Sequence, residues 1–263
     1  MGGDDHPAHV GYDFLMRRLF YAGALSETIE ITGGDAHHLA HVMRAQPGDT
    51  VVVTGTDGRS ARMTVTAVSR ETVALSLSAY LAQEEAEDVE VTLVQALLKG
   101  EKMDLVVQKA AELGAARLCP VLTEHVVVRY DEKKAAAKTA RWQKIADEAA
   151  KQCGRSALMP VAPIADLAAL LRDTFLTGTP DTALIFCYEA EHAISMRCAL
   201  QSIAARRIVL IVGAEGGFSP AEAAMIRTAG AQSVTLGRRI LRAETAALAA
   251  LAVTQYELGN LGV

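Results

Sequence analysis

The amino-acid sequence predicts an α/β protein in which a parallel-sheet domain follows a small β-rich domain. Short strands with polar alternation occupy residues 50–80, whereas apolar strands alternate with helical segments after residue 89. Between them, residues 82–88 (AQEEAED) are acidic and lack an apolar anchor for a core. We therefore expect a flexible or disordered N-terminus over residues 1–14, a β-barrel domain over 15–82, a linker over 83–88 and an α/β domain over 89–263.

The N-terminal domain is expected to be a small barrel. Residues 50–55 (TVVVTG) are rich in β-branched residues, and Asp57-Gly58 is a strong signal for a tight turn. Residues 61–69 and 72–80 then alternate apolar or small residues with polar ones, as strands with one buried face do. A short helix is predicted upstream, over residues 36–44 (AHHLAHVMR).

The C-terminal domain is expected to alternate strands and helices. The predicted strands, apolar for most of their length, are residues 89–97, 116–122, 182–189, 207–213 and 233–237. Residues 99–114 (KGEKMDLVVQKAAELG) place apolar residues at helical spacing and end at Gly114, and residues 135–154 form a second helix. Strands that are apolar throughout are typical of a parallel sheet covered by helices on both faces.

Composition excludes several classes of protein. Hydrophobic residues make up 51% of the 263-residue chain and charged residues 22%, which suits a folded protein with a sizeable core. The four cysteines form no C-x-x-C pair, so neither a disulfide framework nor a zinc site is expected, and a cytoplasmic location fits. No apolar stretch approaches the roughly 20 residues that span a bilayer. The net charge of -5 argues against a strong, sequence-independent nucleic-acid binder.

A glycine-rich loop follows the predicted strand 207–213. In GAEGGFSPAE (residues 213–222), glycines allow a ligand to approach the backbone, and Ser219-Pro220 with Glu222 predicts a capped helix start. Ligands of open parallel sheets bind at the carboxyl ends of strands, so the candidate site loops are this one, CYEAE (187–191) and the stretch from Gly237. A strand-to-helix turn that simply needs glycine is the alternative. The loop matches neither a dinucleotide fingerprint nor a P-loop.

The segment LGRRILRAETAALAAL (residues 236–251) places Arg238, Arg239 and Arg242 at the start of a predicted helix. Cations are unfavourable in a first helical turn, so local structure does not explain these arginines, whereas an anionic partner would. The alternative is an ordinary amphipathic helix whose charges face solvent while Ile240 and the later apolar residues face the core.

Two of these segments, IVGAEGGFS (211–219) and LGRRILRAETA (236–246), resemble motifs of the SPOUT superfamily of knotted methyltransferases, and more narrowly of the ribosomal RNA small-subunit methyltransferase E family. Further segments resemble the family's other motifs in the same order: MRRLF (16–20), HHLAHVMRAQPGD (37–49), LLKGEKMDLVVQKAAELG (97–114) and RWQKIADEAAKQCGRSALMP (141–160). The resemblance covers nearly the whole chain. One departure is Ala214, where the family usually has proline, and it removes no side-chain chemistry.

The resemblance implies transfer of a methyl group from S-adenosyl-L-methionine to N3 of a uridine in 16S ribosomal RNA of the small subunit. It also implies a PUA-like RNA-binding barrel and a trefoil-knotted α/β domain that forms a homodimer. The residues expected to bind the cofactor are Phe186, Cys187, Tyr188, Glu189, Val212, Gly213, Ala214, Glu215, Gly216, Gly217, Leu236, Gly237, Arg238, Ile240, Leu241, Thr245 and Ala246. The expected RNA contacts are Arg17, Arg18, Arg44, Lys99, Lys102 and Arg155.

Methylation at uridine N3 requires loss of the N3 proton, because the protonated nitrogen is a poor nucleophile. Arg242 is the first catalytic candidate, since an arginine near the base would stabilise the charge left on O2 and O4. Glu244 is the second, although it and Glu215 are weak bases at the ordinary carboxyl pKa of about 4.3. Either carboxylate could instead hold an arginine or the cofactor. Glu244 and Thr245 are also expected to cap the helix.

Two other classes of function compete with this prediction. One is a non-catalytic RNA-binding or assembly factor with the same fold, which the intact Gly216-Gly217 pair disfavours. The other is an enzyme acting on a small nucleotide or metabolite, which the missing phosphate-loop pattern disfavours. His37 and His41 are four residues apart on the predicted helix, but no third ligand has a supporting spacing, so no metal site is expected.

Overall fold

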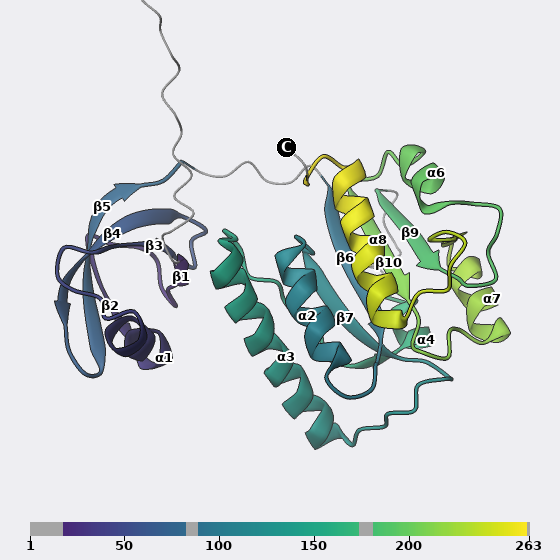
Figure 1. Ribbon diagram of the computed structural model, residues 1–263, viewed down its shortest axis with the longest axis horizontal. Helices are drawn as coiled ribbons and strands as arrows, with labels where there is room; N and C mark the ends of the chain where they lie inside the picture. The colour runs from purple at the N-terminus through teal and green to yellow at the C-terminus, as the bar shows by residue number, and fades with distance from the viewer. Residues whose placement is uncertain (1–17, 83–88, 174–180, 262–263) are drawn as a thin grey trace, which may run out of the picture. The chain divides into compact units, whose positions relative to one another are not determined.

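The computed structural model describes residues 18–82, 89–173 and 181–261 (Figure 1). The chain divides into two compact units, which separate between Glu84 and Glu85. Each unit has its own cluster of buried apolar side chains. The expected flexible tail over residues 1–14 and the expected linker over residues 83–88 lie outside the described residues.

The first unit contains a five-stranded sheet with the strand order β1-β3-β4-β5-β2. Its strands are β1 (Arg18–Phe20), β2 (Thr28–Thr32), β3 (Thr50–Thr54), β4 (Ser60–Val68) and β5 (Thr72–Tyr80). β1 pairs in parallel with β3, and the other neighbours are antiparallel. Register shifts between β4 and β5 mark bulges, which bend and twist a sheet. The sequence predicts β3, β4 and β5, whereas β1 and β2 lack a pattern strong enough to predict them.

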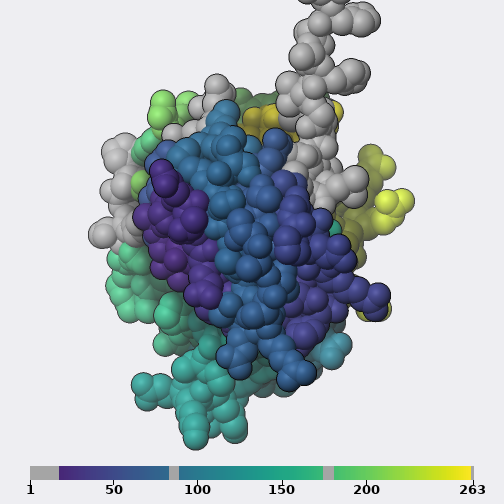
Figure 2. Space-filling view, turned by 90° about the vertical axis from the view of Figure 1, so that its left-hand side faces the viewer, coloured from purple at the N-terminus to yellow at the C-terminus, as the bar shows by residue number. Residues whose placement is uncertain are grey.

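A short helical segment packs against β2 and β5. It consists of α1 (Gly33–His37) and the π-helical turn η1 (His38–Val42), and it overlaps the predicted helix. Ala36 and Leu39 are buried in the core together with alternate residues of β4 and β5. Arg44 follows with a φ of 55°, a left-handed conformation that few non-glycine residues adopt. Figure 2 shows one face of this unit in purple to blue.

The second unit contains a six-stranded sheet with the strand order β11-β9-β10-β6-β7-β8. Its strands are β6 (Glu90–Ala96), β7 (Arg117–Leu122), β8 (Ala165–Asp166), β9 (Thr182–Cys187), β10 (Arg207–Val212) and β11 (Gln232–Val234). Neighbouring strands are parallel, as their apolar sequences predict. The chain runs outward from β6 to β8 on one side, and then places β10 between β6 and β9. Such a change in strand order leaves a crevice at the carboxyl ends of the strands.

The helices of this unit lie between the strands in sequence: α2 (Lys102–Glu112), α3 (Glu132–Cys153), α4 (Leu167–Leu170), α6 (Met196–Gln201), α7 (Pro220–Thr228) and α8 (Ala243–Glu257). α2 packs side by side with α3 and with α8 (Figure 1). Gly114 has a φ of +82° just after α2, so the predicted glycine stop of this helix is confirmed. Among the described residues, every helix is too short or too polar to cross a membrane.

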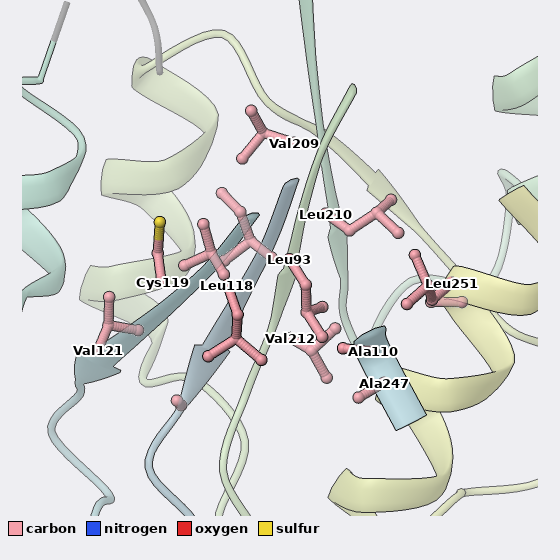
Figure 3. Close-up of a cluster of buried hydrophobic side chains, with 14 of the residues drawn as sticks. Leu93, Ala110, Leu118, Cys119, Val121, Val209, Leu210, Val212, Ala247 and Leu251 are labelled. Carbon is pink, nitrogen blue, oxygen red and sulfur yellow. The ribbon is translucent and has the colours of Figure 1, made fainter. Parts of the chain in front are cut away.

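Aliphatic side chains from the strands form the core of the second unit (Figure 3). Leu93 of β6, Leu118 of β7 and Leu210 of β10 are fully buried. Ala247 and Leu251 of α8 belong to the same cluster, and Figure 3 shows both on the side of the helix that faces the strands. Each large aliphatic side chain buried in this way contributes about 1.5–3 kcal/mol relative to exposure. The core therefore holds the strand ends and the start of α8 in fixed positions.

Candidate active site

A pocket of about 790 Å³ lies in the second unit, where β9, β10 and β11 end. Pockets of this size accept small molecules and cofactors. Its wall is formed mainly by residues of the segments 187–192, 212–217 and 234–243, with Lys102 of α2 and Ala246 of α8. These segments correspond to the three candidate site loops predicted from the sequence, and the fold brings them together.

Two hydrogen bonds fix the loop after β10, one from the side chain of Gln95 and one within the backbone of the loop. Gln95 at the end of β6 is fully buried, and its Nε2 donates to the carbonyl oxygen of Gly213 at 3.2 Å. The Gly217 N–H donates to the carbonyl oxygen of Ala214 at 3.0 Å, which closes the turn. The turn therefore forms with alanine at position 214, where the family usually has proline.

Two glycines in this loop allow other side chains to approach the backbone. A Cβ on Gly216 would lie 2.8 Å from the Cβ of His125, whose Nδ1 is 2.8 Å from the Gly216 carbonyl oxygen. A Cβ on Gly217, which has a φ of +64°, would lie 2.2 Å from Glu189 Oε1. Real side chains essentially never make contacts this short. The glycine pair is therefore needed for close packing as well as for turn geometry.

The helix that follows the loop has the predicted capping box. Ser219 is the N-cap of α7, and its Oγ accepts the Glu222 N–H at 3.3 Å while Glu222 Oε2 accepts the Ser219 N–H at 3.0 Å. Glu222 Oε1 also accepts the backbone N–H of Glu124 at 2.7 Å. The buried Glu222 carboxylate thus joins the start of α7 to the loop that carries His125.

The loop after β9 is fixed by one carboxylate. Glu191 Oε2 accepts the Ser233 hydroxyl at 2.6 Å, and Glu191 Oε1 accepts the N–H groups of Ala193 and Ile194 at 2.9 and 3.3 Å. The hydrogen bond from Ser233, followed by that from Ala193, lowers the pKa of Glu191 to about 2. Beside it, the Thr235 N–H donates to the Ile194 carbonyl oxygen at 2.8 Å. This loop and the segment after β11 therefore form one hydrogen-bonded wall.

The arginine-rich segment crosses the pocket before α8 begins. Gly237 has a φ of +121°, and its N–H donates to Thr235 Oγ1 at 3.2 Å. Ile240 is 90% exposed at the pocket, which rules out the alternative in which it faces the core. Arg242 is exposed and is the N-cap residue of α8, without a side-chain cap bond. The expectation that Glu244 and Thr245 cap this helix is therefore wrong.

Lys102 lies between two carboxylates, Glu215 in the pocket wall and the largely buried Glu244 beside that wall. Its Nζ is 3.0 Å from Glu215 Oε1 and 3.4 Å from Glu244 Oε2. The hydrogen bond with Glu215 raises the pKa of Lys102 despite some burial, and Glu244 adds to the rise. Burial would raise the pKa of Glu215, but the bonds from Lys102 and from the Lys99 N–H outweigh it and lower this pKa. Both groups are therefore held in their charged forms.

The predicted cofactor residues lie mostly in the pocket wall. Those that line it are Cys187, Tyr188, Glu189, Val212, Gly213, Ala214, Glu215, Gly216, Gly217, Leu236, Gly237, Arg238, Ile240, Leu241 and Ala246. Phe186 and Thr245 do not line it: Phe186 is fully buried in the core, and Thr245 is an exposed residue of α8 outside the wall. The wall also contains residues not predicted to bind the cofactor, namely Lys102, His192, Val234, Thr235, Arg239, Arg242 and Ala243. Of these, Arg242 was predicted as a catalytic residue and Lys102 as an RNA contact, whereas the others are indicated only by predicted residues next to them in sequence.

The predicted RNA contacts have different environments. Arg17 lies outside the described residues, and Arg18 is buried in the first unit, so a surface contact by Arg18 is wrong. Arg155 Nη1 donates to the carbonyl oxygens of Ala111 and Ala115 at 3.0 and 2.8 Å, a structural role at the end of α2. Arg44 and Lys99 are exposed, and the contact predictions for these two residues stay predictions.

His37 and His41 lie next to each other in the first unit. The rings of His37 and His41 are 4.6 Å apart between centroids. Within the described ranges, no three His, Cys, Asp or Glu residues are arranged to hold a metal ion.

Comparison with known proteins identifies the class to which the fold and pocket belong. Residues 85–255 match a family model described as an RNA methyltransferase domain, and residues 31–78 match an RNA methyltransferase PUA domain. The chain is similar to a solved structure of a ribosomal RNA small subunit methyltransferase E from Neisseria gonorrhoeae bound to S-adenosyl methionine, at 30% identity. The match covers 91% of this chain and 97% of the other, with a TM-score of 0.80. The predicted SPOUT-type knotted α/β fold with a PUA-like domain is thereby confirmed.

The family follows from the sequence relatives. The ribosomal RNA small subunit methyltransferase E of Bacillus subtilis is 31% identical over 88% of this chain and 90% of its own length. The protein of the same name from a Synechocystis species is 33% identical over 87% of this chain and 73% of its own length. The chain therefore belongs to the ribosomal RNA small subunit methyltransferase E family.

Proposed function

We propose that this protein transfers the methyl group of S-adenosyl-L-methionine to N3 of a uridine in 16S ribosomal RNA. The observation that carries the proposal is the pocket wall built from residues 187–192, 212–217 and 234–243, because the last two of these segments overlap motifs that resemble the family. Relatives with this arrangement are named small-subunit ribosomal RNA methyltransferases, and one of them is described in complex with the cofactor.

The residues present fit this cofactor. The pocket has room for a ligand of that size, and Gly216 and Gly217 form a cradle in which any side chain would meet His125 or Glu189. Backbone groups of residues 212–217 and 236–241 would contact the ligand directly. The bound cofactor supplies an electrophilic methyl group on a sulfonium cation, and Glu189 and Glu215 place negative charge near it.

Arg242 is the residue that we propose to act on the target base. Its exposed position at the N-cap of α8 allows it to reach a base presented at the pocket. Its guanidinium would stabilise the negative charge that spreads onto O2 and O4 when N3 loses its proton. Glu215 is a poor candidate base, because hydrogen bonds from Lys102 and the Lys99 N–H lower its pKa. We propose Glu244, two residues after Arg242, as the second catalytic residue.

The macromolecular partners that we propose are structured 16S ribosomal RNA and a second copy of the chain. The exposed Lys99 and Arg44 would contact phosphates, which respond to local charge within about 8 Å rather than to the net charge of the chain. Apolar side chains at Ile240 and, on α8, at Tyr256 are 90% and 65% exposed, and burial against a second copy would remove them from water. The target base would be flipped out or unpaired to enter the pocket.

Nucleoside mass spectrometry of 16S ribosomal RNA tests this function. RNA from cells that contain the gene should carry one N3-methyluridine that is absent when the gene is deleted, and a plasmid copy should restore it. Identical nucleoside profiles with and without the gene would refute the proposal. Calorimetric titration with S-adenosyl-L-methionine tests the cofactor separately, because a non-catalytic assembly factor would not need to bind it.

A further inference from the structure

We propose that Lys102 is a positioning residue, whose ammonium group links Glu215 in the loop after β10 to Glu244 in the first turn of α8. This proposal deepens the proposed function and rests on it, because it assigns Lys102 to the methyl-transfer site. The alternative role for an exposed basic side chain beside an RNA-binding pocket is contact with a phosphate.

The position of Lys102 in its helix is the first reason. It is the first residue of α2, where the free N–H groups of the helix already create positive potential. A lysine is unfavourable there unless nearby negative charge compensates for it. Glu215 and Glu244 supply that charge from two other elements of the fold, at 3.0 and 3.4 Å from Nζ.

The burial of the three side chains is the second reason. Lys102 and Glu215 are 34% and 32% exposed, whereas Glu244 is only 13% exposed. Glu244 Oε2 is itself buried and has no hydrogen bond of good geometry, so the ammonium of Lys102 is the cation that compensates for it. Removing a partner from a largely buried charge costs much more than removing one from an exposed pair.

The third reason is that the two carboxylates belong to different parts of the proposed site. Glu215 is part of the loop that would hold the cofactor, and its carboxylate is also fixed by the Lys99 N–H at 3.4 Å. Glu244 lies two residues after Arg242, which we propose to contact the target base. Lys102 therefore connects the loop that would hold the cofactor to the helix start that carries Arg242. Its ammonium group has three N–H donors, which suits a bridge between two carboxylates.

If Lys102 contacted an RNA phosphate instead, its substitution would weaken RNA binding and not the chemical step. An ammonium group held by two carboxylates is less available to an anion, since binding a phosphate would break one or both ion pairs. Lys102 should therefore act on the chemical step through the geometry of Glu215, Glu244 and Arg242. Lys99, which is exposed and forms no ion pair within the described part of the chain, is the better phosphate contact.

The test compares Lys102→Met, Lys102→Arg and Lys102→Gln with the wild type in methyl transfer to small ribosomal subunits. Lys102→Met should lower kcat by about tenfold to a hundredfold, as expected when a reacting group is misplaced by about 1 Å. KM for RNA and its salt dependence should stay near the wild-type values, and Lys102→Arg should restore much of kcat. Lys109→Met is the matched control, because Lys109 lies on the same helix, pairs with Glu112 and does not line the pocket.

Two kinetic outcomes would overturn the proposal. One is a raised KM with an unchanged kcat and a salt slope reduced by about 1, which identifies a phosphate contact. The other is a double-mutant cycle of Lys102→Met with Glu244→Gln in which the effects on kcat are additive, which shows that the two residues act independently.

A measurement that does not depend on methyl transfer tests the Lys102 bridge independently of the proposed function. Carboxyl ¹³C NMR of the wild type and of Lys102→Met should show the Glu215 signal titrating at higher pH in the variant, because the Lys102 ammonium lowers the pKa of Glu215. If the wild type does not methylate RNA, the proposed function is refuted, but this NMR comparison still tests the contact between Lys102 and Glu215. An unchanged Glu215 titration would refute the bridge even in an active enzyme.

Discussion

The carboxylate of Glu189 occupies the space where a side chain on Gly217 would begin. A Cβ at Gly217 would lie 2.2 Å from Glu189 Oε1 and 2.8 Å from its carboxyl carbon. The two residues belong to different loops, one after β9 and one after β10, and both line the pocket. Their contact sets the width of the pocket at this point, and it requires glycine.

Substitution Gly217→Ala should therefore affect both stability and cofactor binding. The positive φ should cost about 1–2 kcal/mol of unfolding free energy, because a Cβ is strained in this conformation. The displaced Glu189 carboxylate should weaken binding of S-adenosyl-L-methionine by at least about tenfold, or about 1.4 kcal/mol. Urea unfolding and calorimetric titration measure the two effects.

Gly230→Ala is the control for the glycine prediction. Gly230 also has a positive φ, +91°, but a Cβ there would meet nothing within 4 Å. It should lose similar stability and keep its cofactor affinity. Equal losses of affinity in the two variants would show that strain, not the contact with Glu189, is responsible.

Arg242→Ala should lower kcat by about 10²–10³-fold, as removal of a group that stabilises developing charge does in other enzymes. Affinity for the cofactor should change little, because the proposed partner of Arg242 is the base. Arg242→Lys keeps the charge and should be intermediate. Steady-state kinetics with small ribosomal subunits measures kcat, and an unchanged kcat in Arg242→Ala would remove Arg242 from the catalytic residues.

Glu191→Gln should destabilise the protein in a pH-dependent manner. The folded protein lowers the pKa of Glu191 from its ordinary value of 4.5 to about 2, so the ionised form is the one that stabilises the fold. This stabilisation is fully present above pH 4.5 and disappears as the pH falls toward 2. Urea unfolding at pH 7 and pH 3.5 should show a smaller difference between wild type and variant at the lower pH. A difference that grows on acidification would contradict the assigned hydrogen bonds.

Ser219→Ala should cost about 1 kcal/mol of unfolding free energy, because it removes the N-cap of α7 and half of the capping box. It should also weaken cofactor binding, since α7 begins directly after the glycine loop. Asp131→Ala removes the N-cap of α3, where Asp131 accepts the Lys134 N–H at 2.8 Å. Asp131→Ala should lose comparable stability with no change in cofactor affinity. If it lost as much cofactor affinity as Ser219→Ala, the effect of Ser219 on the pocket would not be specific to the cap of α7.

The sequence predicts the local features of this molecule well, because they depend on neighbouring residues. The parallel strands, the stop at Gly114 and the Ser219–Glu222 capping box each follow from a short pattern. β1 is missed because its three residues are too few for a pattern to appear. The α/β class follows from the apolar strands that alternate with helices. The knot follows only from motifs shared with a family, since no local pattern describes how a chain threads through its own loops.

The roles of individual cations are harder to predict, because they depend on residues far away in the sequence. Lys102 was expected to contact RNA, yet it is bound by Glu215, 113 residues later. Arg155 was expected to do the same, and it instead holds the carbonyl oxygen of Ala115, 40 residues earlier. A basic residue that binds RNA and one that holds the fold look alike in a single sequence. Only the tertiary contacts distinguish them.

Methyl transfer from S-adenosyl-L-methionine carrying a CD₃ group tests the proposed chemistry most directly. Purified protein, the labelled cofactor and small ribosomal subunits from cells lacking the gene should be combined, and the digested 16S ribosomal RNA analysed by mass spectrometry. We expect a single CD₃-labelled N3-methyluridine, formed by the wild type and strongly reduced in Arg242→Ala. Label on another atom or another nucleoside, or no label in the RNA despite cofactor binding, would contradict methyl transfer to uridine N3.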